Sequence, residues 1–136
     1  MKEIQFELAD NVLKAEDFIR LKVATGFIER PLQQVETALE NGLFNVSAIC
    51  DGKVIGKSIG DGAMYWYLQE IVVLPEYQGK GIGKSIVNRL IEYIKSTAIL
   101  GTIIDVGLTA VKGKEPFYEK FGFSIRATGM GNLMEI

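Results

Sequence analysis

The sequence predicts a mixed α/β domain, with a twisted and mostly antiparallel sheet of six or seven strands and about four helices. Alternating apolar and polar residues, interrupted by Asp-Gly pairs, fill the middle of the chain and indicate an antiparallel meander. A later segment with an apolar residue at every fourth position predicts a helix packed on that sheet. The 136 residues, 48% of them hydrophobic, contain no composition shift that would mark a boundary, so we expect residues 1–136 to form a single domain.

The chain begins with a predicted strand and helix. Ile4, Phe6 and Leu8 alternate with polar residues, as in a half-buried strand. Residues 11–24 place apolar side chains at helical spacing, and Gly26 offers a stop. The apolar positions of this helix are Phe18, Ile19 and Val23.

A second helix is predicted directly afterwards. Pro31 suits its first turn, and Asn41-Gly42 suits its end. Its apolar face carries Leu32, Val35 and Leu39.

Three strands of a meander follow. Residues 44–50 and 53–60 are predicted strands joined by a hairpin turn at Asp51-Gly52. Asp61-Gly62 repeats this turn chemistry before residues 65–74, the longest predicted strand.

The second half predicts helices that alternate with strands. Residues 102–108 predict a strand parallel to the previous one, because a helix separates the two. A short helix over 116–121 precedes two final strands at 123–128 and 133–136. The long helix between the parallel strands is marked by Ile82, Ile86, Leu90 and Ile94. The predicted order is β-α-α-β-β-β-α-β-α-β-β.

Charge and composition exclude several classes of function. The net charge is −2, with 15 basic and 17 acidic residues interspersed, so we expect neither a nucleic-acid partner nor a membrane partner. The chain has no His, which excludes a His-dependent triad and His metal ligands, and we expect no metal. A single cysteine, no signal peptide and no long apolar run lead us to expect a cytoplasmic protein.

The most informative segment is a glycine-rich turn between a strand and a helix, residues 74–85. The first N–H groups of a helix have no partner inside the helix, and they carry the positive end of its dipole. Glycines let that backbone approach a ligand closely, and Lys80 and Lys84 add positive charge. The segment therefore predicts a phosphate-binding turn.

Two well-known phosphate motifs fail here by one residue each. The Walker A pattern requires glycine at the position of Gln78. The dinucleotide fingerprint requires two residues after its second glycine, whereas Gly79, Gly81 and Gly83 alternate. The pattern Gln/Arg-x-x-Gly-x-Gly/Ala fits residues 78–83 without a gap.

With this turn, the sequence resembles the GNAT superfamily of N-acetyltransferases. Residues 71–83 are similar to its acetyl-CoA motif, and residues 115–123 are similar to its Phe-Tyr-x-Lys-x-Gly-Phe signature. The resemblance covers essentially the whole chain and implies a GNAT-like acyltransferase fold with acetyl-CoA as acetyl donor. It implies cofactor contacts by Ile71, Val72, Val73, Gln78, Gly79, Lys80, Gly81, Ile82, Gly83, Lys84, Ser85 and Phe117.

The same resemblance implies a catalytic role for Tyr118, which would face the thioester sulfur. A phenol with a pKa near 10 is protonated at neutral pH and can act as a general acid toward a thiolate. Glu70 is a candidate for binding an ammonium or ordering a water as base, because alternation places it on one face with Leu68 and Val72. One departure is Val111, where many family members have Asn, and it puts one polar cofactor contact in doubt.

The expected reaction is acetyl transfer to a primary amine of a small molecule or peptide, by direct attack in a ternary complex. Phe27, Tyr65 and Tyr67 are candidate contacts of the acceptor, since aromatic rings attract organic cations. Dimers are common in the superfamily, so a homodimer is compatible with the resemblance. Two other readings are a catalytically weak, acyl-CoA-binding regulatory module and, disfavoured by the missing Walker glycine, a nucleoside-triphosphate hydrolase.

Overall fold

The protein is described by a computed structural model that covers residues 6–49 and 54–136. Ile4, Cys50 and the hairpin turn predicted at Asp51-Gly52 lie outside the described residues. The described strands form a five-stranded sheet in the order β1-β2-β3-β4-β5. Their bounds are β1 Glu7–Asp10, β2 Phe44–Ile49, β3 Val54–Gly60, β4 Tyr65–Val73 and β5 Asp105–Leu108.

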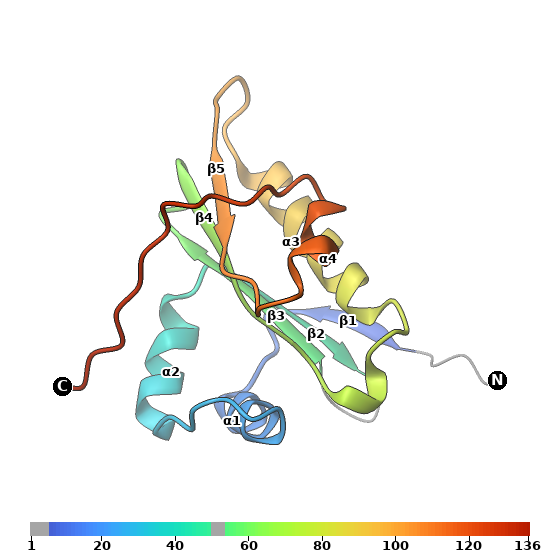
Figure 1. Cartoon of the computed structure of the whole chain (residues 1–136), viewed down its shortest axis with the longest axis vertical. Coiled ribbons are helices and arrows are strands. Elements are labelled where there is room, and N and C mark those ends of the chain that lie inside the picture. The colour runs from blue at the N-terminus through green and yellow to red at the C-terminus, as the bar shows by residue number, and fades with distance from the viewer. Residues whose placement is uncertain (1–5, 50–53) are drawn as a thin grey trace.

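Four α-helices and one 3-10 turn accompany the sheet in the described part of the chain (Figure 1). None of these helices has the length and apolar character needed to cross a membrane. The helices are α1 Ala15–Ala24, α2 Leu32–Asn41, α3 Ile82–Thr97 and α4 Glu115–Glu119, and the 3-10 turn is Pro75–Tyr77.

The sheet is antiparallel from β1 to β4 and parallel between β4 and β5. The parallel pair is joined through α3, as a parallel connection requires. The mixed α/β architecture and the predominance of antiparallel pairing are therefore confirmed.

Two apolar layers flank the sheet. Figure 1 shows α3 and α4 on one side of the sheet, and α1 and α2 on the other. All four apolar positions predicted for the long helix are buried in the α3 layer, namely Ile82, Ile86, Leu90 and Ile94. The other layer joins α1 and α2 to Val72 of β4 through Phe18, Leu21 and Val35.

A β-bulge in β4 changes which side chains face which layer. Ile55 of β3 pairs with Val72 and Lys57 pairs with Gln69, so two residues of β4 oppose one residue of β3. Within this bulge Glu70 adopts the left-handed conformation, with φ of 56°.

The bulge corrects the expectation that Leu68, Glu70 and Val72 share a face. Leu68 is buried in the α3 layer, whereas Val72 is buried in the α1–α2 layer. Glu70 contacts α1, so it shares a face with Val72 only. Simple alternation failed because one extra residue reverses the side-chain order of a strand.

The first helix is shorter than predicted and buries a different face. It begins at Ala15, because Lys14 before it is extended, with φ of −96° and ψ of 147°. Asn11 is not helical either, since its φ is 58° and its backbone N–H donates to the Asn45 carbonyl at 2.8 Å. Its buried face carries Leu21 and Lys22 beside Phe18, whereas Val23 is 50% exposed.

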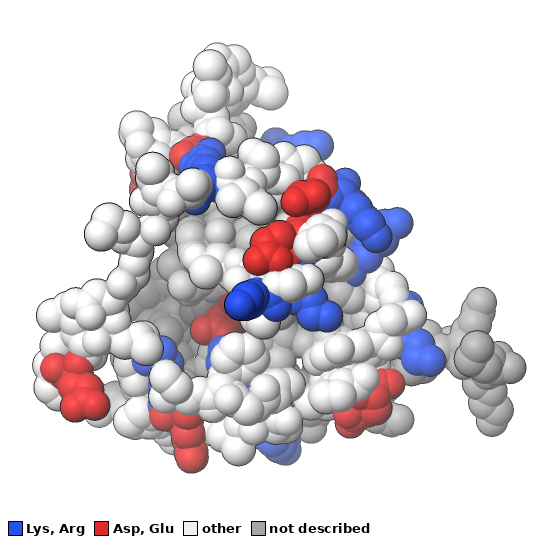
Figure 2. Space-filling view, viewed as in Figure 1, with Lys and Arg blue, Asp and Glu red and all other residues white. Residues whose placement is uncertain are grey.

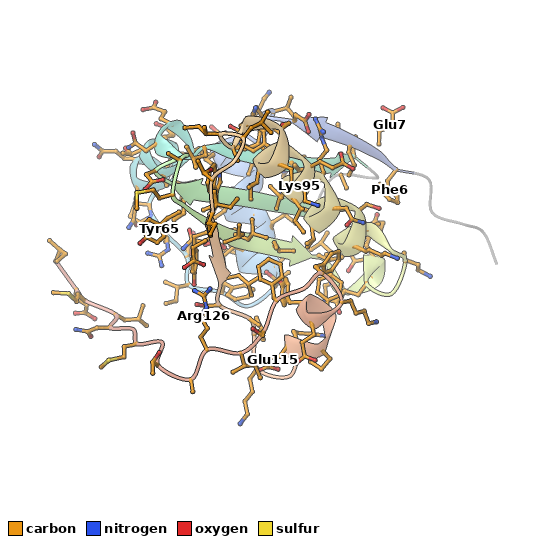
Figure 3. All side chains as sticks on the ribbon, turned by 90° about the horizontal axis from the view of Figure 1, so that it is seen from above. Phe6, Glu7, Tyr65, Lys95, Glu115 and Arg126 are labelled. Carbon is orange, nitrogen blue, oxygen red and sulfur yellow. The ribbon has the colours of Figure 1, made fainter. Side chains whose placement is uncertain are left out.

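The two final strands predicted at 123–128 and 133–136 are absent, so the described sheet has fewer than the six or seven strands expected. The segment after α4 crosses in front of β4 and β5 and ends away from the sheet (Figure 1). Phe123 still packs against the α3 layer, but the apolar residues beyond it are not covered, and Ile125 and Leu133 are 72% and 84% exposed. Arg126, labelled in Figure 3, ties the segment to β5 because it donates to both carboxylate oxygens of Asp105, at 3.0 and 2.9 Å.

Candidate functional site

A cleft opens where β4 and β5 diverge. The two strands stay paired only as far as Leu68 and Leu108, so residues 69–73 of β4 continue beside open space. The cleft has a volume of about 220 Å³. Figure 2 shows this face of the molecule hollowed between α4 and the pair α1–α2. The lining comes from residues 67–72 together with Lys22, Phe27, Leu108, Thr109, Val111 and Tyr118.

The glycine-rich turn lies between the end of β4 and the start of α3. Its conformation favours glycine at two positions, because Gly79 and Gly81 have φ of 75° and 81°. The first backbone hydrogen bond of α3 runs from the Ser85 N–H to the Gly81 carbonyl at 3.1 Å. The N–H groups of residues 82–84 therefore precede the hydrogen-bond ladder of a 16-residue helix, at the positive end of its dipole.

The space beside the two left-handed glycines of the turn is open. A Cβ built at Gly79 or at Gly81 would meet no atom of the described residues within 4 Å. A Cβ at Gly83 would lie 3.6 Å from both Phe117 and Val73, so this glycine is where α4, β4 and α3 meet. Such a turn can accept an anionic group at the helix N-terminus.

The remaining predicted cofactor residues have different roles in the turn. Ile82 is 1% exposed, so only its backbone can reach a ligand. Lys80 and Lys84 are exposed on either side of it. The Gln78 side chain donates to the Val73 carbonyl at 3.0 Å and so ties the turn to β4. Ser85 is half-buried, and its hydroxyl donates to the Gly81 carbonyl at 3.0 Å.

Tyr118 reaches the cleft from α4. Its ring packs edge-on against Phe117 and Phe123, with centroids 5.0 and 6.4 Å away. Burial raises the pKa of the Tyr118 phenol above its ordinary value, because the anion would lose its water. The phenol therefore stays protonated at neutral pH.

The aromatic residues at the start of β4 separate into two groups. Tyr67 lines the cleft, and its hydroxyl is hydrogen-bonded to the Thr109 hydroxyl. Tyr65 is 55% exposed at the other end of the β4–β5 pairing, where it opposes Asp105, and it is not among the cleft residues (Figure 3). Of these two candidate residues, Tyr67 lines the cleft and Tyr65 does not.

Glu70 is not a free carboxylate. Its Oε2 accepts a hydrogen bond from the Lys22 ammonium, and the two side chains are only 23% and 11% exposed. The same ammonium lies 3.8 Å from the ring centroid of Phe27, in cation–π geometry. Phe27 lines the cleft, and the cation on its ring is the protein's own Lys22.

The end of α1 fixes this arrangement. Gly26 adopts φ of 81°, its N–H donates to the Val23 carbonyl, and the Phe27 N–H donates to the Lys22 carbonyl at 3.0 Å. This is a Schellman motif, in which the second residue past the helix cap donates its N–H to a carbonyl of the last turn, and its side chain packs against the residue that carries this carbonyl. Phe27 is thereby brought onto Lys22.

Lys22 was missed by the sequence analysis. The apolar spacing of α1 suggested Val23 for the buried face, and a lysine between Leu21 and Val23 gave no catalytic signal. The available signal was Gly26, which was predicted to stop the helix. A Schellman ending at Gly26 brings Phe27, the residue after the glycine, into contact with Lys22, four residues before the glycine.

Comparison with known proteins identifies one family. The family model described as Acetyltransferase (GNAT) domain matches residues 41–125. The chain is 28% identical over 106 residues to the uncharacterised N-acetyltransferase ycf52 of Pyropia yezoensis, an alignment that covers 74% of the chain and 59% of that relative. It is 32% identical over 68 residues to the glucosamine 6-phosphate N-acetyltransferase of Trypanosoma brucei brucei, covering 50% of the chain and 40% of the relative. The chain thus spans only part of the length of these two relatives.

Solved structures share the fold over nearly the whole chain. A protein of unknown function from Staphylococcus aureus superimposes with a TM-score of 0.83 at 26% identity, covering 97% of this chain and 99% of the other. A GNAT-family acetyltransferase from Streptococcus pneumoniae superimposes with a TM-score of 0.79 at 26% identity, covering 97% and 100%.

Proposed function

Because this chain belongs to the GNAT acetyltransferase family, we propose that it transfers the acetyl group of acetyl-CoA to a primary amine of a small molecule or peptide, by direct attack in a ternary complex. The observation that carries the proposal is the cleft between β4 and β5, which is lined by Tyr118 and by the part of β4 that leads to the glycine-rich turn and the start of α3.

The donor is proposed to enter along the diverging strands. The N–H groups of residues 82–84, with Lys80 and Lys84, hold the diphosphate of acetyl-CoA at the helix N-terminus. The backbone of residues 71–73 runs beside the pantetheine arm as a neighbouring strand would. The absence of a Cβ at Gly79 and Gly81 supports close approach of a bulky anion. Phe117 packs beside this path and keeps α4 close to it.

The chemistry requires positioning and a proton donor. The neutral amine attacks the thioester carbonyl, the carbon–sulfur bond breaks, and the departing thiolate takes the phenolic proton of Tyr118. The extra proton left on the acetylated nitrogen returns to the Tyr118 phenolate through water, which restores the phenol. The proton that the ammonium must first lose passes through water toward Glu70. Alignment of two bound reactants can contribute about 7–11 kcal/mol, so most of the rate comes from holding donor and acceptor together.

Calorimetry with acetyl-CoA, followed by a thiol-release assay with a panel of primary amines, tests this function. We expect heat on titration with acetyl-CoA, no heat with ATP, and thiol release that depends on an amine. Absence of heat with acetyl-CoA, or release that is the same with and without amines, would contradict the proposal.

A further inference from the structure

The charge of the acceptor cleft is set by one ion pair. Of the described residues that line the cleft, Lys22 and Glu70 are the charged ones, and they contact each other. The cleft is therefore close to neutral, and a purely cationic amine gains little Coulomb attraction from it.

Lys22 is held in place from several directions. Its ammonium contacts Glu70 and lies over the ring of Phe27 at 3.8 Å, and its side chain is only 11% exposed. The Schellman ending of α1 fixes Phe27 beside it. The ammonium therefore cannot reach bulk water without losing its contacts with both Glu70 and Phe27.

This geometry constrains any ligand that uses Glu70. An alkylammonium that takes the Glu70 carboxylate leaves the Lys22 ammonium poorly hydrated and without a counter-ion, which is unfavourable. A ligand that also brings an anion replaces the internal pair by two new pairs and leaves no charge uncompensated. Because Lys22 and Glu70 touch, the two charges of that ligand must be separated by only a few bonds.

We propose that the acceptor carries an anionic group, a carboxylate or a phosphate, beside its primary amine, and that Lys22 binds this anion while Glu70 receives the ammonium. This inference rests on the proposed acetyl transfer and narrows its substrate class. It makes Lys22 a specificity-determining residue and disfavours polyamines, peptide N-termini and simple arylalkylamines, which lack a nearby anion.

Matched pairs of acceptors test the inference in the thiol-release assay. Phenylalanine is compared with phenylalaninamide, and phosphoethanolamine with ethanolamine, so that each pair differs in one anionic group and the two pairs separate carboxylate from phosphate. We expect kcat/KM to be higher by about tenfold or more for the anionic member of at least one pair, as a charge-assisted hydrogen bond provides.

Variants of the ion pair assign this preference to Lys22. Lys22→Met should bring the ratio within a pair close to one while the Kd for acetyl-CoA stays unchanged, and Lys22→Arg should keep the preference. Arg20→Met is the matched control on the same helix, because Arg20 pairs with Asp17 on the exposed side, and it should leave the ratio unchanged. If Lys22→Met does not fold, the double variant Lys22→Met/Glu70→Gln leaves no unpaired charge, and it should also lose the preference.

The outcomes separate the two proposals. Equal rates for both members of every pair, or a preference that survives in Lys22→Met or in the double variant, overturns the role of Lys22 and leaves acetyl transfer standing. If no amine gives thiol release although acetyl-CoA binds, the proposed function fails and the substrate class fails with it.

Discussion

The ring of Phe117 packs against Gly83, with its Cζ 3.6 Å from the position that a Cβ would take on that glycine. The contact joins α4 to the first turn of α3. Tyr118, the neighbour of Phe117, is thereby fixed relative to the helix start that we propose binds the diphosphate. The proton donor and the donor-binding turn are coupled by one packing contact, although 35 residues separate Gly83 from Tyr118 in the sequence (118 − 83).

Enlarging Gly83 should disturb this coupling. A Cβ at this position already lies 3.6 Å from Phe117 and Val73, so the further carbons of Gly83→Leu have no free space. We therefore expect urea unfolding to show a free energy of unfolding lower by about 1–3 kcal/mol. Calorimetry should show weaker acetyl-CoA binding. Gly83→Ala is the control, because a Cβ makes only ordinary contacts and alanine favours a helix by up to about 1 kcal/mol. Equal stability of the leucine and alanine variants would contradict the packing described here.

The left-handed cap at Gly81 should be sensitive to backbone strain rather than to crowding. Its φ is 81° and no atom lies within 4 Å of a built Cβ, so Gly81→Ala should lose about 1–2 kcal/mol of unfolding free energy from conformation alone. Gly81→Asn should lose less, because asparagine tolerates this conformation. Urea unfolding of the two variants measures the difference, and an asparagine variant no better than alanine would argue against the left-handed cap.

Replacing the Tyr118 phenol should slow the chemistry and spare donor binding. We expect Tyr118→Phe to lower kcat by about 10²–10⁴-fold with little change in the Kd for acetyl-CoA. Burial raises the pKa of the phenol, so the phenol should stay protonated at the pH values where an ordinary tyrosine begins to ionise. In that pH range the rate should therefore not fall through ionisation of Tyr118. A regulatory module that only binds acyl-CoA would show no rate to lose.

Asp61 shapes the turn before β4, as its Asp-Gly context suggests. Its Oδ1 accepts hydrogen bonds from the N–H groups of Tyr65, Ala63 and Met64 at 3.0, 2.9 and 2.8 Å. The bond from the Tyr65 N–H first, and those from Ala63 and Met64 with it, hold the pKa of the carboxyl below its usual value.

The sign of the resulting pH dependence follows from that lowered pKa. The stability that Asp61 contributes is present above the pKa of the unfolded chain and is lost as pH falls through the lower pKa of the folded state. We expect Asp61→Ala to lower Tm near neutral pH, with a smaller difference from wild type in acid. Asp61→Asn should retain more stability, because its side-chain oxygen still accepts the three bonds. Thermal unfolding across pH checks both variants, and a difference that grows in acid would contradict the assignment.

Gly56 permits α3 to approach the sheet. A Cβ there would lie 2.4 Å from Cγ2 of Ile86 and 3.2 Å from Cδ1 of Leu90, so we expect Gly56→Ala to cost about 1–3 kcal/mol of unfolding free energy. In an Ile86→Ala background the same change should cost much less, because the colliding methyl group is gone. A double-mutant cycle in urea measures this coupling, and additive losses would show that the contact is absent.

Several features of the fold could be predicted because they depend on local chemistry. The amphipathic period of α3, the Asp-Gly turn at Asp61 and the glycine-rich turn each depend on a few neighbouring residues. Tyr67 and Tyr118, two of the candidate site residues, line the cleft, whereas Tyr65, chosen on the same ground as Tyr67, does not. The prediction of two final strands was wrong. A strand needs a neighbouring strand to pair with, and the alternation of apolar and polar residues within 123–136 does not provide that neighbour.

The sequence by itself determined the order of the main elements, the shape of the glycine-rich turn and the family to which the chain belongs, since these rest on spacing between close neighbours. Only the tertiary structure decided that Glu70 faces α1 and meets Lys22, 48 residues away in the chain. The reason is the bulge in β4, where one extra residue reverses the side-chain order. That reversal depends on how β4 pairs with β3, and such pairing is a property of two strands together.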